Sequence, residues 1–115
     1  MGYYSDVVLV LSKKGAQALN KRIEEADMET GHTFQVDFAD KYLSLENAVL
    51  YYWENIKWYT FFPEVRWLED FIDSLDEKDF LFVRIGEEYD DTEQDGEYLD
   101  NPFCVSISRK ITFNG

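Results

Sequence analysis

Cysteine and histidine are nearly absent from this 115-residue sequence, which contains one of each. The single cysteine, Cys104, excludes an intramolecular disulfide and is typical of a cytosolic protein. The single histidine, His32, stands in a predicted turn, where an exposed residue is more common than a catalytic base. The sequence also has no cysteine–histidine cluster, no glycine-rich phosphate loop and no nucleophile elbow. These absences predict a protein that is not an enzyme and has no cofactor.

Long hydrophobic runs are also missing. The longest purely apolar run near the start covers residues 7–11, which is too short for a signal peptide or a membrane span. Asp6 occupies the position at which an N-myristoylation motif requires serine or threonine. We therefore expect a soluble cytoplasmic protein that has no membrane partner.

Basic residues are few, 11 against 24 acidic ones, so the formal net charge is −13. Acidic residues are concentrated in residues 87–100, which hold eight carboxylates and no lysine or arginine. The rest of the chain contains 16 acidic and 11 basic residues. Such a local negative field repels the phosphates of nucleic acids and of anionic lipids, and it attracts cations or a basic protein surface. Direct nucleic-acid binding is therefore not expected.

Apolar and aromatic side chains are plentiful, at 45% and 17% of the residues. This composition excludes a disordered chain despite the charge. The length suits a single domain, 1–115, that buries roughly two thirds of the surface of its unfolded chain.

The first half of the chain predicts strands and one helix. Residues 3–11 are branched and aliphatic with little alternation, which is typical of a central strand buried on both faces. Ser12 is placed to cap a helix that runs to about residue 29 with an apolar stripe. Residues 33–39 alternate between apolar and polar, as in a half-exposed strand. Residues 45–59 also fit a helical stripe, but their aromatic and branched side chains favour a strand, which residues 33–39 need as a partner.

The second half predicts a helix and two strands. Pro63 suits the first turn of a helix that ends near residue 76. Residues 79–86 and 103–113 alternate as strands and are joined by an acidic hairpin loop, 87–101. The order β-α-β-β-α-β-β predicts an α+β fold, a ferredoxin-like split β-α-β sandwich whose antiparallel sheet carries both helices on one face.

Two arginines interrupt the apolar rows of the strands that flank the acidic loop. Arg84 precedes the loop and Arg109 follows it. We expect them to pair with carboxylates such as Glu87 or Asp100 and to hold the base of the hairpin, at ~0–1 kcal/mol for each exposed pair.

Three segments, 52–59, 63–65 and 84–91, resemble pieces of small bacteriophage and prophage proteins of unknown function. The segments lie within the central half of the chain, and their motifs are not specific to any chemistry. The resemblance implies a viral or prophage setting, and so the cytoplasm of a bacterial host. It assigns no activity.

Three interpretations of the acidic loop remain open: a solvated loop, a divalent-cation site, and a ridge that binds a basic protein. The cation site would use Asp91, Glu93 and Asp95, spaced as at the start of a calcium loop, although Pro102 replaces the glutamate of position twelve. A ridge of carboxylates would imitate duplex phosphates, which lie about 1.7 Å apart along the axis. The ridge residues are Glu87, Glu88, Asp90, Asp91, Glu93, Asp95 and Glu97.

Seven aromatic residues crowd positions 51–62. Most are expected to fill the core, since the net charge disfavours base stacking. A second protein-binding patch is expected at Trp58, Tyr59 and Trp67.

The leading hypothesis is a small acidic phage-type interaction protein. It would bind a basic host protein, as a nucleic-acid mimic or an inhibitor of host defence. The alternatives are a divalent-cation-binding module and a structural phage protein without a ligand, each as a monomer or homodimer.

Overall fold

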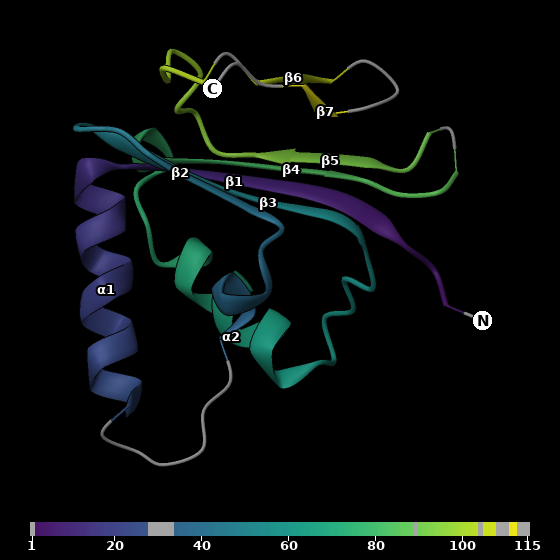
Figure 1. Ribbon diagram of the computed structural model, residues 1–115, viewed down its shortest axis with the longest axis horizontal. Helices are drawn as coiled ribbons and strands as arrows, with labels where there is room; N and C mark the ends of the chain where they lie inside the picture. The colour runs from purple at the N-terminus through teal and green to yellow at the C-terminus, as the bar shows by residue number, and fades with distance from the viewer. Residues whose placement is uncertain (1, 28–33, 89, 104, 108–110, 113–115) are drawn as a thin grey trace.

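The main sheet has five antiparallel strands in the order β2-β3-β1-β4-β5. The computed structural model describes residues 2–27, 34–88, 90–103, 105–107 and 111–112. The strands are β1 (Ser5–Ser12), β2 (Lys41–Ser44), β3 (Ala48–Ile56), β4 (Phe80–Ile85) and β5 (Thr92–Asp95). Two helices, α1 (Lys13–Asp27) and α2 (Pro63–Asp73), cover one face of this sheet (Figure 1).

The strand β1 forms the centre of the sheet, paired with β3 on one side and β4 on the other. Residues 7–11 have no exposed surface at all. The unbroken apolar run is therefore explained by burial on both faces, as the sequence predicts.

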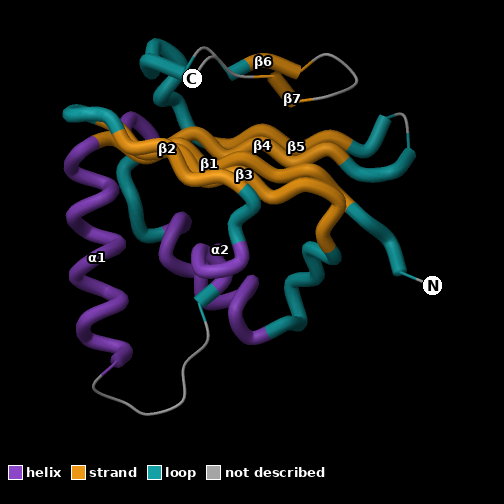
Figure 2. Tube along the Cα trace, in the orientation of Figure 1, coloured by secondary structure: helices purple, strands orange, loops and turns teal. Residues whose placement is uncertain are grey.

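Successive residues of β1 serve two different cores. Val7, Leu9 and Leu11 face the helices, where they join a cluster that includes Leu19 of α1 and Leu68 of α2. The alternate residues face the other side of the sheet. There they pack with residues of β3 and β4 and with Phe103, which the C-terminal part of the chain supplies. The sheet is thus the middle of three layers, and Figure 2 shows the helices on one side and the C-terminal segment on the other.

Ser12 ends β1 and starts α1. Its Oγ accepts a hydrogen bond from the Gly15 N–H at 3.1 Å, as expected for a helix cap, and donates one to Asp79 Oδ1 at 2.8 Å. A Cβ atom at residue 15 would lie 2.9 Å from the Asp79 carbonyl oxygen. Glycine in this first turn therefore permits the close approach of α1 to the short 3₁₀ helix η2 (Glu77–Asp79).

The helix α2 begins at Pro63, as predicted, and ends at Asp73. Its buried side chains are Val65, Leu68, Phe71 and Ile72, which recur at helical spacing and pack against the sheet. Outside this buried stripe, the surface of α2 carries mainly acidic side chains.

The prediction for residues 33–39 is wrong. Residue 33 lies outside the described residues, and Gln35–Phe38 forms a 3₁₀ helix, η1, in which Asp37 N–H donates to the Phe34 carbonyl. Apolar alternation fails there, because Phe34 is buried while Phe38 is 54% exposed. The Gln35 carbonyl instead accepts a hydrogen bond from Trp53 Nε1 at 3.0 Å, which fixes η1 against β3.

Residues 45–59 contain the predicted strand, β3, and not a helix. Its hairpin partner is β2, since Leu45 N–H donates to the Ala48 carbonyl at the turn. The expectation of a strand was therefore right, whereas the partner expected for it was not.

The C-terminal prediction is also wrong. The strand next to β4 is β5, which lies inside the predicted acidic loop, 87–101. Residues 103–113 do not extend the main sheet in the described part of the chain. They contribute β6 (Ser106–Ile107) and β7 (Ile111–Thr112), which pair with each other in a separate two-stranded ribbon.

Two glycines permit this path. The Gly86 N–H donates to the Asp91 carbonyl and closes the turn into β5, and Gly96 at φ +91° leads the chain out of it. The structure is therefore α+β, with a five-stranded antiparallel sheet and two helices. The ferredoxin-like order of elements is not confirmed, because the strands after β4 differ from those expected. No helix in the described residues has the length and apolar character needed to cross a membrane.

Candidate functional site

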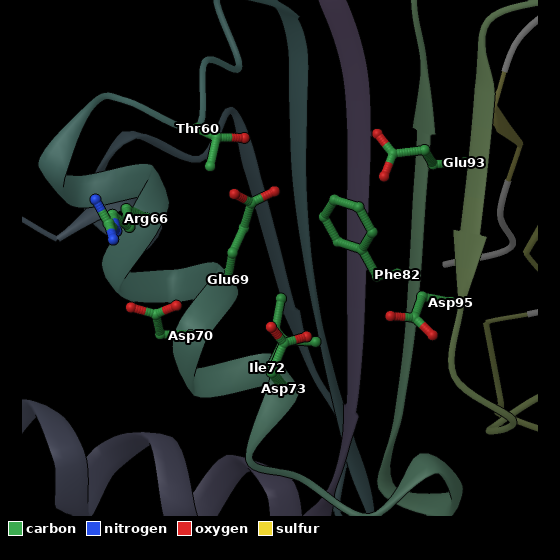
Figure 3. A pocket seen from close by; sticks show the side chains of 9 residues that line it. All are labelled: Thr60, Arg66, Glu69, Asp70, Ile72, Asp73, Phe82, Glu93 and Asp95. Carbon is green, nitrogen blue, oxygen red and sulfur yellow. The ribbon is translucent and has the colours of Figure 1, made fainter.

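A cleft with a volume of about 420 Å³ lies between α2 and the strands β4 and β5. Figure 3 shows its side chains, which come from α2 on one side, from the sheet on the other, and from Thr60 in the turn before α2. The lining residues are Thr60, Arg66, Glu69, Asp70, Ile72, Asp73, Phe82, Glu93 and Asp95. Five of these nine carry a carboxylate, and we call this feature the acidic cleft.

The helical wall follows from the spacing of residues in α2. Glu69 and Asp73 are four residues apart and therefore lie on one stripe, beside Asp70. This stripe adjoins the buried one, so that Ile72 belongs both to the core and to the cleft lining. In Figure 3, Glu69 and Asp73 extend towards the centre of the cleft.

The sheet wall follows from alternation in β5. Glu93 and Asp95 are two residues apart and share the face that is turned to the helices. Their cross-strand partners in β4 are Arg84 and Phe82. Phe82, only 5% exposed, gives the cleft an apolar floor between the two acidic walls.

Arg66 is the one basic residue among the described residues that line the cleft. Five carboxylates stand against two cations, Arg66 in the cleft and Arg84, which bonds Glu93. Acid therefore remains in excess and leaves a negative potential, which low-dielectric walls focus. The arrangement can hold lysine, arginine or another cationic group.

Arg84 neutralises part of the predicted acidic ridge. Its guanidinium bonds Asp91 through Nη2 at 2.7 Å and Glu93 through Nε at 2.5 Å. The expectation that Arg84 pairs with loop carboxylates is thus correct, but Glu87 and Asp100 are not the partners found. Arg109 lies outside the described residues.

Tyr3 completes this anchor. Its hydroxyl donates to Asp91 Oδ2 at 2.5 Å and accepts from the Glu88 N–H at 3.1 Å. The hydrogen bonds from Arg84 and Tyr3 lower the pKa of Asp91, and the bond with Asp91 raises the pKa of Tyr3. A methyl group at Gly86 would overlap both the Asp91 carboxylate and the Tyr3 hydroxyl. The described residues of the turn, 86–88 and 90–91, are therefore held to Tyr3 through Glu88 and Asp91.

The residues of the predicted ridge lie in different surroundings. Glu93 and Asp95 line the acidic cleft, and Asp91 belongs to the anchor. Glu87 accepts a hydrogen bond from the Tyr4 N–H. The remaining members, Glu88, Asp90 and Glu97, are exposed and lie outside the cleft. Sequence reasoning missed Glu69, Asp70 and Asp73, although their spacing on a predicted helix was the available signal.

The cation site proposed for Asp91, Glu93 and Asp95 has no geometric support. Two of these three carboxylates bond the same guanidinium. Within the described part of the chain, no group of three or more histidine, cysteine, aspartate or glutamate residues could hold a metal ion. His32 and Cys104 lie outside the described residues.

The predicted aromatic patch is not one surface. Trp58 is only 7% exposed, because its ring packs against Trp53 at 5.0 Å and Phe82 at 5.9 Å between centroids, so the outward placement expected for it is wrong. Tyr59 accepts a hydrogen bond from the Tyr3 N–H. Trp67 is half-buried and stacks on Phe71 within α2.

Comparisons with models of protein families, with curated protein sequences and with solved structures gave no match.

Proposed function

We propose that this protein binds a basic partner protein through the acidic cleft, and that it acts by binding and not by catalysis. One observation carries this proposal: α2 and β5, which are distant in sequence, line a single cleft with five carboxylates. Sequence reasoning attributed the function to a ridge in the loop. The site proposed here retains Glu93 and Asp95 of that ridge and adds Glu69, Asp70 and Asp73.

The partner we propose is a host protein that binds nucleic acid, with the protein itself acting as a nucleic-acid mimic in the host cytoplasm. The net charge of −13 supports this, because a basic groove evolved for phosphates attracts such a surface. The phage or prophage origin implied by residues 52–59, 63–65 and 84–91 is part of the same proposal.

We further propose a ferredoxin-like core made of β1 to β4 with α1 and α2, to which β5 adds an outer strand. Two features support this description. The first strand lies between β3 and β4, and both helices cover the same face of the sheet.

The experiment is a pull-down from bacterial lysate with two variants of equal charge change. The cleft variant carries Glu69→Gln, Asp73→Asn, Glu93→Gln and Asp95→Asn. The control variant neutralises four exposed acids away from the cleft: Glu24→Gln, Glu25→Gln, Glu46→Gln and Glu54→Gln. We expect a nucleic-acid-binding protein to be retained by the wild type and the control, released by moderate salt, and lost with the cleft variant. Equal retention by both variants would contradict the proposal.

A second candidate function is self-assembly as a structural component. Three of the five large hydrophobic side chains that are exposed in the described residues, Phe38, Tyr42 and Leu45, lie close together in sequence at β2. Like β5, β2 is an outer strand of the sheet. Size-exclusion chromatography with light scattering decides this point: a monomer at 100 µM and above excludes it.

A further inference from the structure

The outer edge of β5 carries backbone groups that no strand in the described residues pairs with. Two hydrogen bonds fix which groups these are. The Gly86 N–H donates to the Asp91 carbonyl, and the Tyr98 N–H donates to the Phe80 carbonyl, so the even-numbered residues of β4 bond towards β5. Because hydrogen-bonding directions alternate along an antiparallel strand, the backbone N–H and carbonyl groups of Glu93 and Asp95 point towards β4, and those of Gln94 point outwards. The N–H and carbonyl of Gln94 therefore lie on the open edge.

This edge has little of the protection that outer strands normally have. Every residue of β5 is exposed, and the strand contains no proline and no lysine. Its protection consists of its short length of four residues and of its acid. The acid repels a second copy of the same edge, because Glu93 and Asp95 would meet carboxylates of that copy. The same acid attracts a basic strand.

We propose that β5 accepts an extended basic segment of a partner protein as a sixth strand of the sheet. This inference rests on the proposed function and specifies how the partner is held. Main-chain bonds to Gln94 would supply affinity, as in other cases of strand addition. Charge complementarity identifies the occupant as a segment with lysine or arginine at alternate positions.

The alternation follows from the geometry of the sheet. A strand added about 4.8 Å from β5 places every second side chain on the helix-covered face, beside Glu93 and Asp95. Long basic side chains on that face reach the acidic cleft and the carboxylates of α2, Glu69 and Asp73. The intervening side chains lie beside Thr92 and Gln94, so they need to be neutral and polar.

The test uses labelled peptides that differ only in their backbone. The parent peptide is four repeats of lysine–threonine. One derivative is N-methylated on the threonine amides and another on the lysine amides, so all three have the same charge. In an antiparallel added strand the threonine amides face β5 and the lysine amides face solvent. Fluorescence anisotropy at 50 mM salt should show at least tenfold weaker binding for the threonine-methylated peptide and little change for the other.

Protein variants provide a second arm. Gln94→Pro removes the outward N–H without a change of charge, and proline is tolerated on an edge strand at such a position. It should weaken binding of the parent peptide at least tenfold, whereas Gln94→Ala, which keeps the N–H, should not. If Gln94→Pro does not fold, as judged by circular dichroism, the methylated peptides still give the answer.

Each result has one meaning. A reversed effect of the two methylation patterns supports addition of a parallel strand. Equal binding of all three peptides overturns strand addition but leaves a charge-based proposed function intact. No binding of any peptide at 50 mM salt overturns strand addition too, and the lysate experiment then judges the proposed function separately.

Discussion

The strands β2 and β5 are the two outer strands of the sheet, and they present different chemistry. Tyr42 on β2 is 55% exposed, and the exposed Phe38 and Leu45 lie just outside the two ends of that strand. In β5 two of the four residues are acidic, and the anchor built on Arg84 and Tyr3 holds the turn that leads into it. One sheet therefore offers an apolar edge and a charged edge at opposite ends. A partner that suits one of them does not suit the other.

The largest expected loss of stability is that caused by Gly96→Ala, which alters the end of β5. Residue 96 has φ +91°, and a Cβ there would overlap the Phe80 carbonyl and ring. Strained backbone of this kind costs about 1–3 kcal/mol, and the overlap adds to it. Urea denaturation should show a loss of at least ~2 kcal/mol. Asn47→Ala, in the turn beside β2, is the matched control and should cost less than about 1 kcal/mol.

Arg84→Gln should weaken the same edge by a smaller amount. The substitution removes the guanidinium that bonds Asp91 and Glu93 and leaves two carboxylates close together. Both partners are partly exposed, so we expect a loss of about 1–2 kcal/mol in urea denaturation. If Arg84→Gln unfolds at the wild-type urea concentration, the anchor contributes nothing to stability.

Low pH should destabilise the side of the sheet that carries β5. The pKa of Asp91 is lowered in the folded protein, so its contribution to stability is complete above the unfolded value of about 3.8 and is lost as the pH falls through the folded value. Asp91→Asn should remove this part of the pH dependence in urea denaturation between pH 5 and pH 2.5. Asp90→Asn, at an exposed neighbouring carboxylate, should not.

High pH should destabilise the side of the sheet that carries β2. Burial raises the pKa of Tyr51 and Tyr52 to about 12, and Tyr51 pairs with Tyr42 across the β2–β3 hairpin. The stability that depends on their neutral form is complete below pH 10 and is lost as the pH rises towards 12. Absorbance at 295 nm should show a transition near pH 12 that is smaller in Tyr51→Phe than in the wild type. Titration of all tyrosines near pH 10 would contradict this.

The smallest expected effect is that of Tyr42→Ser on the β2 edge. The side chain is mostly exposed and its main contact is the Tyr51 ring, at 5.0 Å between centroids. We expect a loss of stability within about 0.5–1 kcal/mol. If the apolar edge mediates self-association, the same substitution should shift the oligomer towards monomer in light scattering, whereas Gln94→Ala on β5 should not.

The sequence was sufficient for the elements that a strong apolar pattern controls. Residues 7–11 can only be central, and Pro63 with a helical stripe predicts α2, because burial dominates in both. The strand β5 could not be foreseen, because Thr92–Asp95 has no apolar side chain and its place in the sheet depends on backbone bonds and on two glycines.

The acidic cleft shows the same limit. Its sheet wall was among the residues singled out by local charge density, since Glu93 and Asp95 belong to a dense acidic run. Its helical wall was not, because Glu69 and Asp73 are unremarkable in sequence and gain meaning only when α2 packs opposite β5. The alternation of residues 33–39 predicted a strand wrongly for a related reason. The Trp53 indole donates a hydrogen bond to the Gln35 carbonyl, and this tertiary contact overrides the local pattern.

The central position of β1 has a consequence for synthesis of the chain. This strand is synthesised before both of its partners, and because Leu11 pairs with Phe80, its second neighbour is made much later. Until β4 emerges, an apolar β-branched strand keeps an open edge, which is a hazard for aggregation. Nascent chains that end before residue 80 should therefore recruit chaperones, and the same truncations expressed alone should accumulate as insoluble protein.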